Sequence, residues 1–220
     1  MMKGKLIVIE GTDASGKATQ TKLLMNHFKK KRKKVILMSF PRYNTFFGKL
    51  IGKYLAGEFG TKEKFSSESA AMLYALDKYS ASDEIKKKLS QGFTVILDRY
   101  TASNIAHQGA KFTNTAKRNK FIKWVSNLES ALPKPSFTFF LDVPVPISQK
   151  LMHGEDRKKK YRKGKTKDIH ESDLKYLERT RKIYLELAKQ KNWKKINCVS
   201  NSKLKPKEEI HVKILKTLKV

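Results

Sequence analysis

The sequence predicts an α/β fold in which a five-stranded parallel sheet is covered by helices on both faces. Three observations support this prediction. Apolar segments of strand length alternate with longer segments whose apolar residues have helical spacing. The apolar segments contain few polar residues, as expected for parallel strands that are buried on both faces. A glycine-containing loop follows the first of them, and parallel sheets bind ligands at the carboxyl ends of their strands.

The expected elements alternate along the chain. Five segments are expected to be strands: residues 5–9, 35–40, 93–97, 136–141 and 195–199. Helices are expected at residues 20–31, 48–55, 69–90 and 207–218. The strongly charged irregular stretch GEDRKKKYRKGKTK, residues 154–167, is expected to be a short mobile lid or a disordered loop. Residues 1–220 are therefore expected to form a single domain.

Length and composition are those of one globular domain. The chain has 220 residues, of which 39% are hydrophobic, enough to bury a core. Its first residues do not resemble a signal peptide, and the apolar run at residues 6–9 is too short to cross a membrane. Cys198 is the only cysteine, so no internal disulfide forms, which fits a reducing compartment. We expect a cytoplasmic protein without membrane association.

The formal net charge of +29 is unusual for a domain of this size. A positive field of this strength attracts nucleic acids, nucleotides and anionic membranes. The basic residues nevertheless occur from end to end, and only eight of the 49 are arginines, the residue best suited to reading phosphates and bases. We interpret the charge as a lysine-rich solvated surface, and we expect nucleic-acid binding only as a non-specific effect.

The loop EGTDASGKATQ, residues 10–20, matches a phosphate-binding loop at all but one position. Gly11, Gly16 and Lys17 meet the pattern G-x-x-x-x-G-K-[ST], but Ala18 stands where a hydroxyl usually helps to hold Mg²⁺. A strand before the loop and a helix after it provide the required context, in which backbone N–H groups surround phosphate oxygens. The expected phosphate-binding residues are Gly11, Thr12, Asp13, Ala14, Ser15, Gly16, Lys17, Ala18 and Thr19.

Ala18 raises the question whether the site is active, inactive or holds its metal in another way. Nucleoside monophosphate kinases related to adenylate kinase commonly carry G-K-G-T-Q here, also without a hydroxyl directly after the lysine. Similarity to that group implies that phosphates, waters and one carboxylate hold Mg²⁺, and that Thr19 serves a phosphate. We therefore interpret the site as active.

The chain as a whole resembles the thymidylate kinase family. The resemblance is carried by residues 10–24, 40–55 (FPRYNTFFGKLIGKYL), 73–79 (LYALDKY), 97–110 (LDRYTASNIAHQGA), 139–144 (FFLDVP) and 168–188. These segments cover most of the sequence in the family's order. The resemblance implies a P-loop kinase that uses ATP and Mg²⁺ to phosphorylate dTMP to dTDP, and that forms a homodimer.

The resemblance also assigns residues to the acceptor nucleotide. Asp13 is expected to bind the 3′-hydroxyl of the deoxyribose, and Phe40 to line the nucleoside pocket. Arg42 is expected to grip the acceptor phosphate with its planar guanidinium group. Ser103 and Gln108 are expected near the edge of the thymine base.

Two positions depart from the family's pattern in this region. Tyr74 is expected to stack on thymine, but Lys78, four residues later on the same helix face, replaces an arginine that donates to the base. A lysine offers the base a single donor instead of a planar fork. His107 replaces the usual tyrosine, and we expect it to pack beside the sugar or to form only a wall of the pocket, without a catalytic role.

The resemblance implies which residues take part in phosphoryl transfer. Asp98 is placed like the carboxylate that orders Mg²⁺ and its waters, and Arg99 is expected to meet the acceptor phosphate and the charge that develops in transfer. Ala14 assigns the chain to the family type whose catalytic arginine comes from the lid. The expected catalytic residues are Lys17, Arg99, Arg157 and Arg162.

Two other functions remain open at this point. A kinase for dUMP, another nucleoside monophosphate or a deoxynucleoside would use the same loop. Asp13 favours an acceptor with a 3′-hydroxyl, and Arg42 with Arg99 favours one that already carries a phosphate. A nucleic-acid-binding P-loop protein is the alternative of a different class, but it would have no use for the carboxylates of Asp13 and Asp98.

Overall fold

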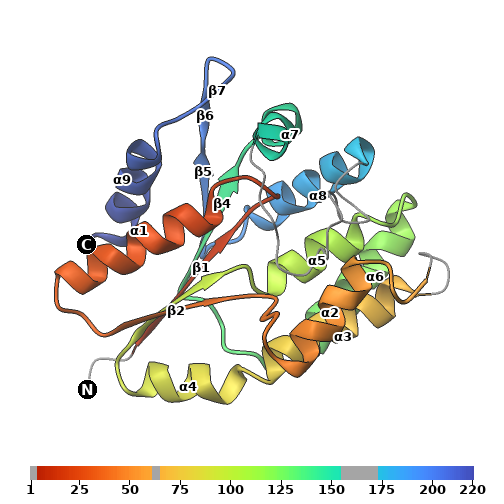
Figure 1. Cartoon of the computed structure of the whole chain (residues 1–220), viewed down its shortest axis with the longest axis horizontal. Helices are drawn as coiled ribbons and strands as arrows, with labels where there is room; N and C mark the ends of the chain where they lie inside the picture. Colours follow the sequence, from red (N-terminus) through yellow and green to blue (C-terminus); the bar gives the residue numbers. More distant parts are fainter. Residues whose placement is uncertain (1–3, 61–64, 155–172) are drawn as a thin grey trace.

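The computed structural model describes residues 4–60, 65–154 and 173–220, and it has the predicted architecture (Figure 1). The main sheet has five strands in the order β2-β3-β1-β4-β5. The strands are β1 (Lys5–Glu10), β2 (Val35–Ser39), β3 (Thr94–Asp98), β4 (Phe137–Asp142) and β5 (Trp193–Asn197). Every neighbouring pair is parallel, so all five carboxyl ends lie at one edge of the sheet.

Helices connect these strands, and the last helix follows them. They are α1 (Lys17–Lys30), α2 (Phe46–Leu55), α3 (Ser67–Tyr79), α4 (Ser82–Ser90), α5 (Thr101–Gly109), α6 (Thr115–Leu128), α7 (Val145–Gly154), α8 (Leu174–Leu187) and α9 (Lys207–Leu218). The sequence did not predict the short antiparallel hairpin of β6 (Val199–Ser200) and β7 (Lys203–Leu204) after β5. None of the helices in the described ranges is both long and apolar enough to span a lipid bilayer.

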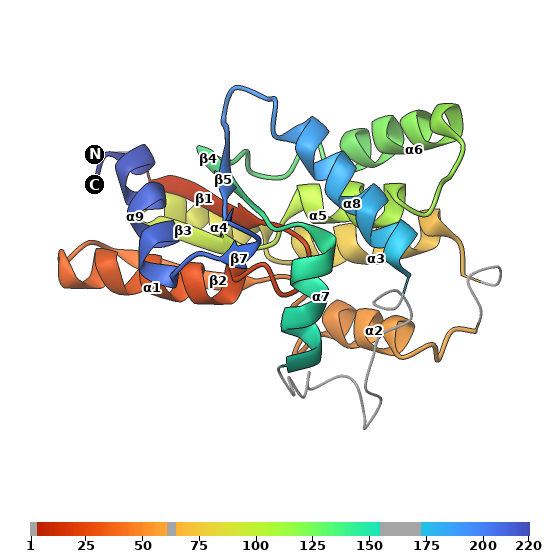
Figure 2. The same ribbon diagram turned by 90° about the horizontal axis from the view of Figure 1, so that it is seen from above.

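The two faces of the sheet are covered by different helices. Successive side chains of β1 point to opposite faces, so Ile7 packs with Leu24 of α1 and the apolar side of α9. Val8 points the other way and belongs to a core with Ile85 of α4. Helices α2, α3, α5, α6 and α8 gather at one end of the molecule, away from α1 and α9 (Figure 2). The functional residues described below lie where these helices meet the carboxyl edge of the sheet.

The prediction of a single helix over residues 69–90 is wrong, because the helix is interrupted between Tyr79 and Ser82, which separates α3 from α4. In a continuous α-helix, the carbonyl oxygen of Asp77 would accept from the N–H group four residues later. Here that oxygen accepts from Ser80 Oγ at 2.9 Å and from Arg42 Nη2 at 3.3 Å. The N–H group of Ala81 donates instead to Lys78. A side chain from the β2–α2 connection thus helps to end α3.

Candidate active site

The phosphate loop joins β1 to α1, and its glycines permit its backbone shape. Gly16 precedes α1 with φ of 89°, in the left-handed region. Gly11 has φ of 154°, and a Cβ atom there would lie 2.5 Å from Ser15 Oγ. Both positions therefore require glycine. Ala14 also has a positive φ, 57°, which a residue with a side chain adopts at a cost in energy.

Lys17 begins α1, and its ammonium group lies inside the loop, where Nζ donates to the carbonyl oxygen of Thr12 at 2.7 Å. Burial, together with the nearby charge of Arg99, lowers the pKa of Lys17 to about 8. The hydroxyl groups of Thr12 and Ser15 are buried as well, and neither has a hydrogen-bond partner within the described residues. Buried polar groups normally have partners. The loop is therefore complementary to a ligand with several acceptor oxygens, such as the polyphosphate of a nucleotide.

Arg99 connects the phosphate loop to α5. It follows β3 in the left-handed backbone region, with φ of 67°, and its N–H group donates to the Ile9 carbonyl oxygen. Its Nη2 donates to Asp13 Oδ1 at 2.8 Å, and its Nη1 donates to the Gly11 carbonyl oxygen at 3.0 Å. Nη1 also lies 3.2 Å from Ser103 Oγ. The structure thus brings three of the expected site residues, Asp13, Arg99 and Ser103, into one network.

His107 completes the surroundings of the Arg99 guanidinium group. Its Nε2 lies 3.1 Å from Arg99 Nη1, and its Nδ1 lies 3.2 Å from the hydroxyl of Tyr176. Because arginine only donates, Nε2 must accept, and the ring proton belongs on Nδ1. Tyr176 in turn donates to the carbonyl oxygen of His107 at 3.1 Å. The residue expected beside the sugar or in the pocket wall therefore contacts Arg99 directly.

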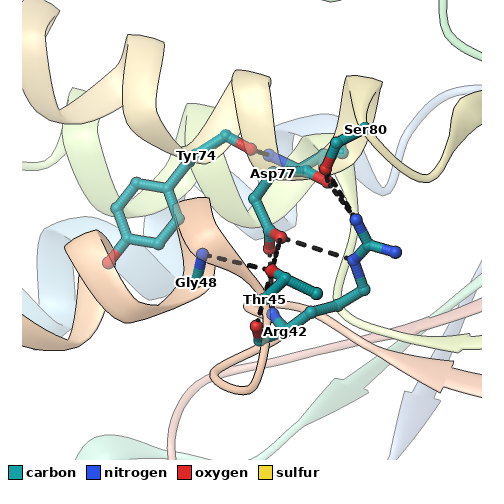
Figure 3. Close-up of polar contacts among 7 residues, drawn as sticks. Arg42, Thr45, Gly48, Tyr74, Asp77 and Ser80 are labelled. Atoms are coloured by element: carbon teal, nitrogen blue, oxygen red, sulfur yellow. Dashed lines mark hydrogen bonds and ion pairs between the residues drawn. The ribbon is translucent and has the colours of Figure 1, made fainter.

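Arg42 follows β2, the strand next to β3, and its side chain is held by α3 (Figure 3). Its backbone N–H donates to Asp77 Oδ2 at 2.9 Å, its Nε to Asp77 Oδ1 at 3.4 Å, and its Nη2 to Ser80 Oγ at 2.6 Å. Thr45 Oγ1 lies 3.3 Å from the same carboxylate. These bonds aim the guanidinium group but leave part of it accessible, because the side chain is 18% exposed.

Lys78 is turned into the protein interior. Its side chain is 3% exposed, and Nζ donates to Glu129 Oε1 at 2.8 Å and to the Tyr74 carbonyl oxygen at 2.9 Å. Asn104 Nδ2 donates to the same glutamate oxygen at 2.7 Å. Two of the three ammonium hydrogens are therefore engaged by the protein. The Tyr74 ring packs edge-on against Tyr54, in the core between α2 and α3.

The remaining expected acceptor residues lie in the same region. Phe40 is buried, with its ring 5.8 Å from that of Tyr100, and the Arg42 guanidinium group lies over its face. Gln108 is buried on α5, and its Oε1 has no hydrogen-bond partner within the described residues. Ser103 Oγ donates to the carboxylate of Glu10 at 2.6 Å.

Sequence reasoning missed three buried carboxylates of this site, and the first of them, Asp77, holds Arg42. Glu129 follows α6 and holds Lys78 and Asn104, and Glu10 ends β1 and holds Ser103. Glu10 directly precedes the phosphate-loop motif at the end of an apolar strand, and this charge in an otherwise buried position was a usable signal. Glu129 follows a polar helix, and its partners are distant in sequence, so nothing local distinguished it.

The residues fit an Mg²⁺ ion held mainly by phosphate and water oxygens. Asp98 supplies one carboxylate beside the loop. Burial raises the pKa of Asp98, while the charges of Lys17 and Arg99 lower it. Among the described residues, no three His, Cys, Asp or Glu side chains lie close enough together to hold a metal ion alone.

The other residues expected at the phosphates are only partly described. Ala18 is exposed and Thr19 is partly buried at the start of α1. The expected lid arginines, Arg157 and Arg162, lie outside the described residues.

A phosphate loop, a carboxylate at the end of the adjacent strand β3 and arginines at the same edge of a parallel sheet define the class of P-loop kinases. Within that class, the thymidylate kinase family model matches residues 9–214 of the chain. The chain belongs to the thymidylate kinase family. The resemblance seen in the sequence and the predicted fold are both confirmed.

Known proteins from distant organisms are similar over nearly the whole chain. The thymidylate kinase of Plasmodium falciparum is 33% identical over 216 residues, which is 97% of this chain and 89% of that protein. The thymidylate kinase of Homo sapiens is 30% identical, over 89% of this chain and 83% of that protein. The solved structure of thymidylate kinase from Candida albicans superimposes with a TM-score of 0.77 and 27% identity, covering 99% of this chain and 93% of that one.

Proposed function

We propose that the chain transfers the γ-phosphoryl group of ATP to dTMP, giving dTDP and ADP by in-line displacement. This is the reaction of the thymidylate kinase family, so the chain is an ATP-dependent dTMP kinase of nucleotide biosynthesis. The observation that carries the assignment of residues is the position of Arg99. Its guanidinium group binds Gly11 and Asp13 of the phosphate loop and also Ser103 of α5.

On the donor side, the phosphate loop binds the phosphates of ATP. The N–H groups of residues 12–19 surround the β-phosphate at the positive end of α1, and Lys17 reaches the β- and γ-phosphates. Thr19 serves a phosphate in place of the hydroxyl that Ala18 lacks. Asp98 would help to hold Mg²⁺, and the bound ion would neutralise negative charge on the phosphates of ATP.

On the acceptor side, Arg42 and Arg99 bind the phosphate of dTMP, and Asp13 binds the 3′-hydroxyl. A further group of residues surrounds the nucleoside: Phe40, Tyr74, Lys78, Ser103 and Gln108. The attacking oxygen belongs to a phosphate that is already anionic, so the reaction requires no general base. Positioning and stabilisation of charge therefore supply the catalysis.

The arginine that stabilises the transferring phosphoryl group comes from the lid, residues 154–167. With Ala14 in the phosphate loop, Arg157 and Arg162 are the candidates. Their role is a proposal that rests on the family resemblance alone. The match of the family model to residues 9–214 supports one domain that includes this lid.

The enzyme forms a homodimer in the cytoplasm. Helix α3 supports the dimer, because Met72 and Leu76 lie one turn apart on the same face and are each 43% exposed. Phe46 at the start of α2 is 71% exposed. Binding of nucleic acid is only a non-specific consequence of the net charge of +29.

A coupled assay across dTMP, dUMP, dGMP, AMP and thymidine tests this function. We expect dTMP to have the highest kcat/KM, with dUMP second and the purine monophosphates far behind. The Lys17→Ala variant, purified by the same procedure, is the control for the activity of contaminating kinases. Faster phosphorylation of AMP or dGMP than of dTMP would overturn the assignment, and a preference for dUMP would replace it with the second candidate.

A further inference from the structure

Glu10 is a charged residue in the centre of the protein. It is the last residue of β1, and none of its surface is exposed. Its Oε1 accepts from the N–H groups of Tyr100 at 2.8 Å and Ser103 at 3.2 Å. Its Oε2 accepts from the hydroxyl groups of Ser103 at 2.6 Å and Tyr184 at 3.1 Å. A buried carboxylate with four donors is held in one orientation, since each lost bond leaves a buried polar group unsatisfied.

The first function of these bonds is to cap α5. A helix begins with N–H groups that have no partner inside the helix, and the residue before it usually supplies an oxygen. The residue before α5 is Tyr100, whose side chain makes no such bond. Glu10, ninety positions earlier in the chain, supplies the oxygen instead. A negative carboxylate at this end of a helix is also favoured by the helix dipole.

The cap is adjacent to Arg99, which has the unfavourable left-handed backbone conformation with φ of 67°. Tyr100, the next residue, is held by Glu10 through its N–H group. The Arg99 side chain is tied to the same carboxylate through Ser103, whose Oγ donates to Glu10 and lies 3.2 Å from Arg99 Nη1. Glu10 therefore constrains both the backbone and the guanidinium group of Arg99.

We propose that Glu10 is a positioning residue for phosphoryl transfer, which sets the direction of the Arg99 guanidinium group toward the acceptor phosphate. The proposal rests on the proposed function in one respect, the role of Arg99. Glu10 itself does not touch the substrate, because its oxygens are occupied by groups of the protein. If Glu10 acted only as a helix cap, its mutation would lower stability and would not change the KM for dTMP more than the KM for ATP.

The test is a double-mutant cycle that combines Glu10→Ala with Arg99→Ala. We expect Glu10→Ala to lower kcat/KM for dTMP on the order of 10²-fold, the cost of misplacing a catalytic group by about 1 Å. The KM for ATP should change less than about twofold, because the bonds of Lys17 do not involve Glu10. In the Arg99→Ala background, Glu10→Ala should have little further effect, since residues that act together are not additive.

Asp142→Asn is the matched control. Asp142 is also a buried carboxylate at the end of a strand, β4, but it is bound by Arg181 at 2.8 Å and not by residues next to Arg99. This variant should melt at a lower temperature than the wild type and keep the wild-type KM for dTMP. If Glu10→Ala does not fold, Glu10→Gln carries the same cycle, because its single oxygen can still cap α5; we expect a loss of about tenfold in kcat/KM for dTMP.

The outcomes separate the two claims. An Arg99→Ala enzyme with wild-type activity would refute the proposed role of Arg99 in binding the acceptor phosphate. A large loss in Arg99→Ala combined with wild-type kcat/KM in Glu10→Gln would refute only the role of Glu10. Additive effects of Glu10→Ala and Arg99→Ala, or equal increases in KM for both substrates, would also show that Glu10 does not act through Arg99.

Discussion

The donor side and the acceptor side of this site are built in different ways. The phosphate loop is a continuous segment, and its lysine bonds to a carbonyl oxygen five positions earlier. On the acceptor side, the three cations described above are each bound to a carboxylate far along the chain. Arg42 and Asp77 are 35 positions apart, Lys78 and Glu129 are 51 apart, and Arg99 and Asp13 are 86 apart.

This difference shows how the functional groups in each half of the site are held in position. The loop depends on its own glycines and on the start of α1, so a single residue such as Lys17 carries much of its chemistry. The acceptor side depends on pairs, in which a carboxylate fixes the direction of a cation before the substrate arrives. Preorganised charges need less rearrangement during the reaction. The partner of each cation should therefore matter almost as much as the cation.

The largest expected effect is on the donor side. Lys17→Ala should lower kcat by about 10³-fold or more, because a buried cation that contacts the transferring phosphates is lost. Steady-state kinetics at saturating ATP and dTMP measure this. Lys22→Ala, a change of an exposed lysine on the same helix, is the control and should leave kcat unchanged. Substantial turnover by Lys17→Ala would show that the loop is not the donor site.

Breaking a buried acceptor-side pair should give the largest loss of stability. Glu129→Gln leaves the ammonium group of Lys78, which is 3% exposed, without its opposite charge. Removing one partner of a buried ion pair commonly costs about 3–5 kcal/mol. Denaturant unfolding of the variant and the wild type gives this value directly. A change below about 1 kcal/mol would mean that the ammonium group of Lys78 is bound elsewhere, and that the pair does not organise the acceptor side.

Asp77→Asn sharpens the comparison, because it changes the partner of Arg42 without changing Arg42. The asparagine retains one oxygen but loses the charge that holds Nε at 3.4 Å. We expect the KM for dTMP to rise about tenfold, the effect of one charge-assisted hydrogen bond, while the KM for ATP stays constant. Asp83→Asn, which removes an exposed carboxylate next to Lys86, should change neither value. Equal effects of both variants on KM for dTMP would point to the overall charge as the cause.

The smallest expected effect is that of Ala18→Ser. If Mg²⁺ is held by phosphates, waters and Asp98, an added hydroxyl after Lys17 should change kcat and the Mg²⁺ requirement by less than about twofold. Titration of activity with Mg²⁺ measures both. A strong increase in Mg²⁺ affinity would mean that the missing hydroxyl limits this enzyme.

The features that could be predicted are those that depend on residues close together in the sequence. The phosphate loop was found because its glycines and Lys17 are required by one short backbone turn. Arg42 and Asp98 were expected at the ends of apolar strands, and they do lie there, Arg42 three residues after β2 and Asp98 as the last residue of β3. The fold followed from the same alternation of strands and helices.

The parts that were not predictable depend on distant partners. The break between α3 and α4 depends in part on Arg42, which binds the carbonyl oxygen of Asp77 and which no local pattern within residues 69–90 reveals. The inward direction of Lys78 depends on Glu129, and the cap of α5 depends on Glu10. In each case a polar group is satisfied by a residue at least 35 positions away.

The most direct test of this account is a calorimetric comparison of dTMP and thymidine as ligands of the wild-type enzyme. Arg42 and Arg99, aimed by Asp77 and Asp13, are expected to bind the phosphate with about 3 kcal/mol in total, so dTMP should bind about 100-fold more tightly than thymidine. Similar affinities for the two ligands would contradict the account, because the paired arginines would then not be directed at an acceptor phosphate.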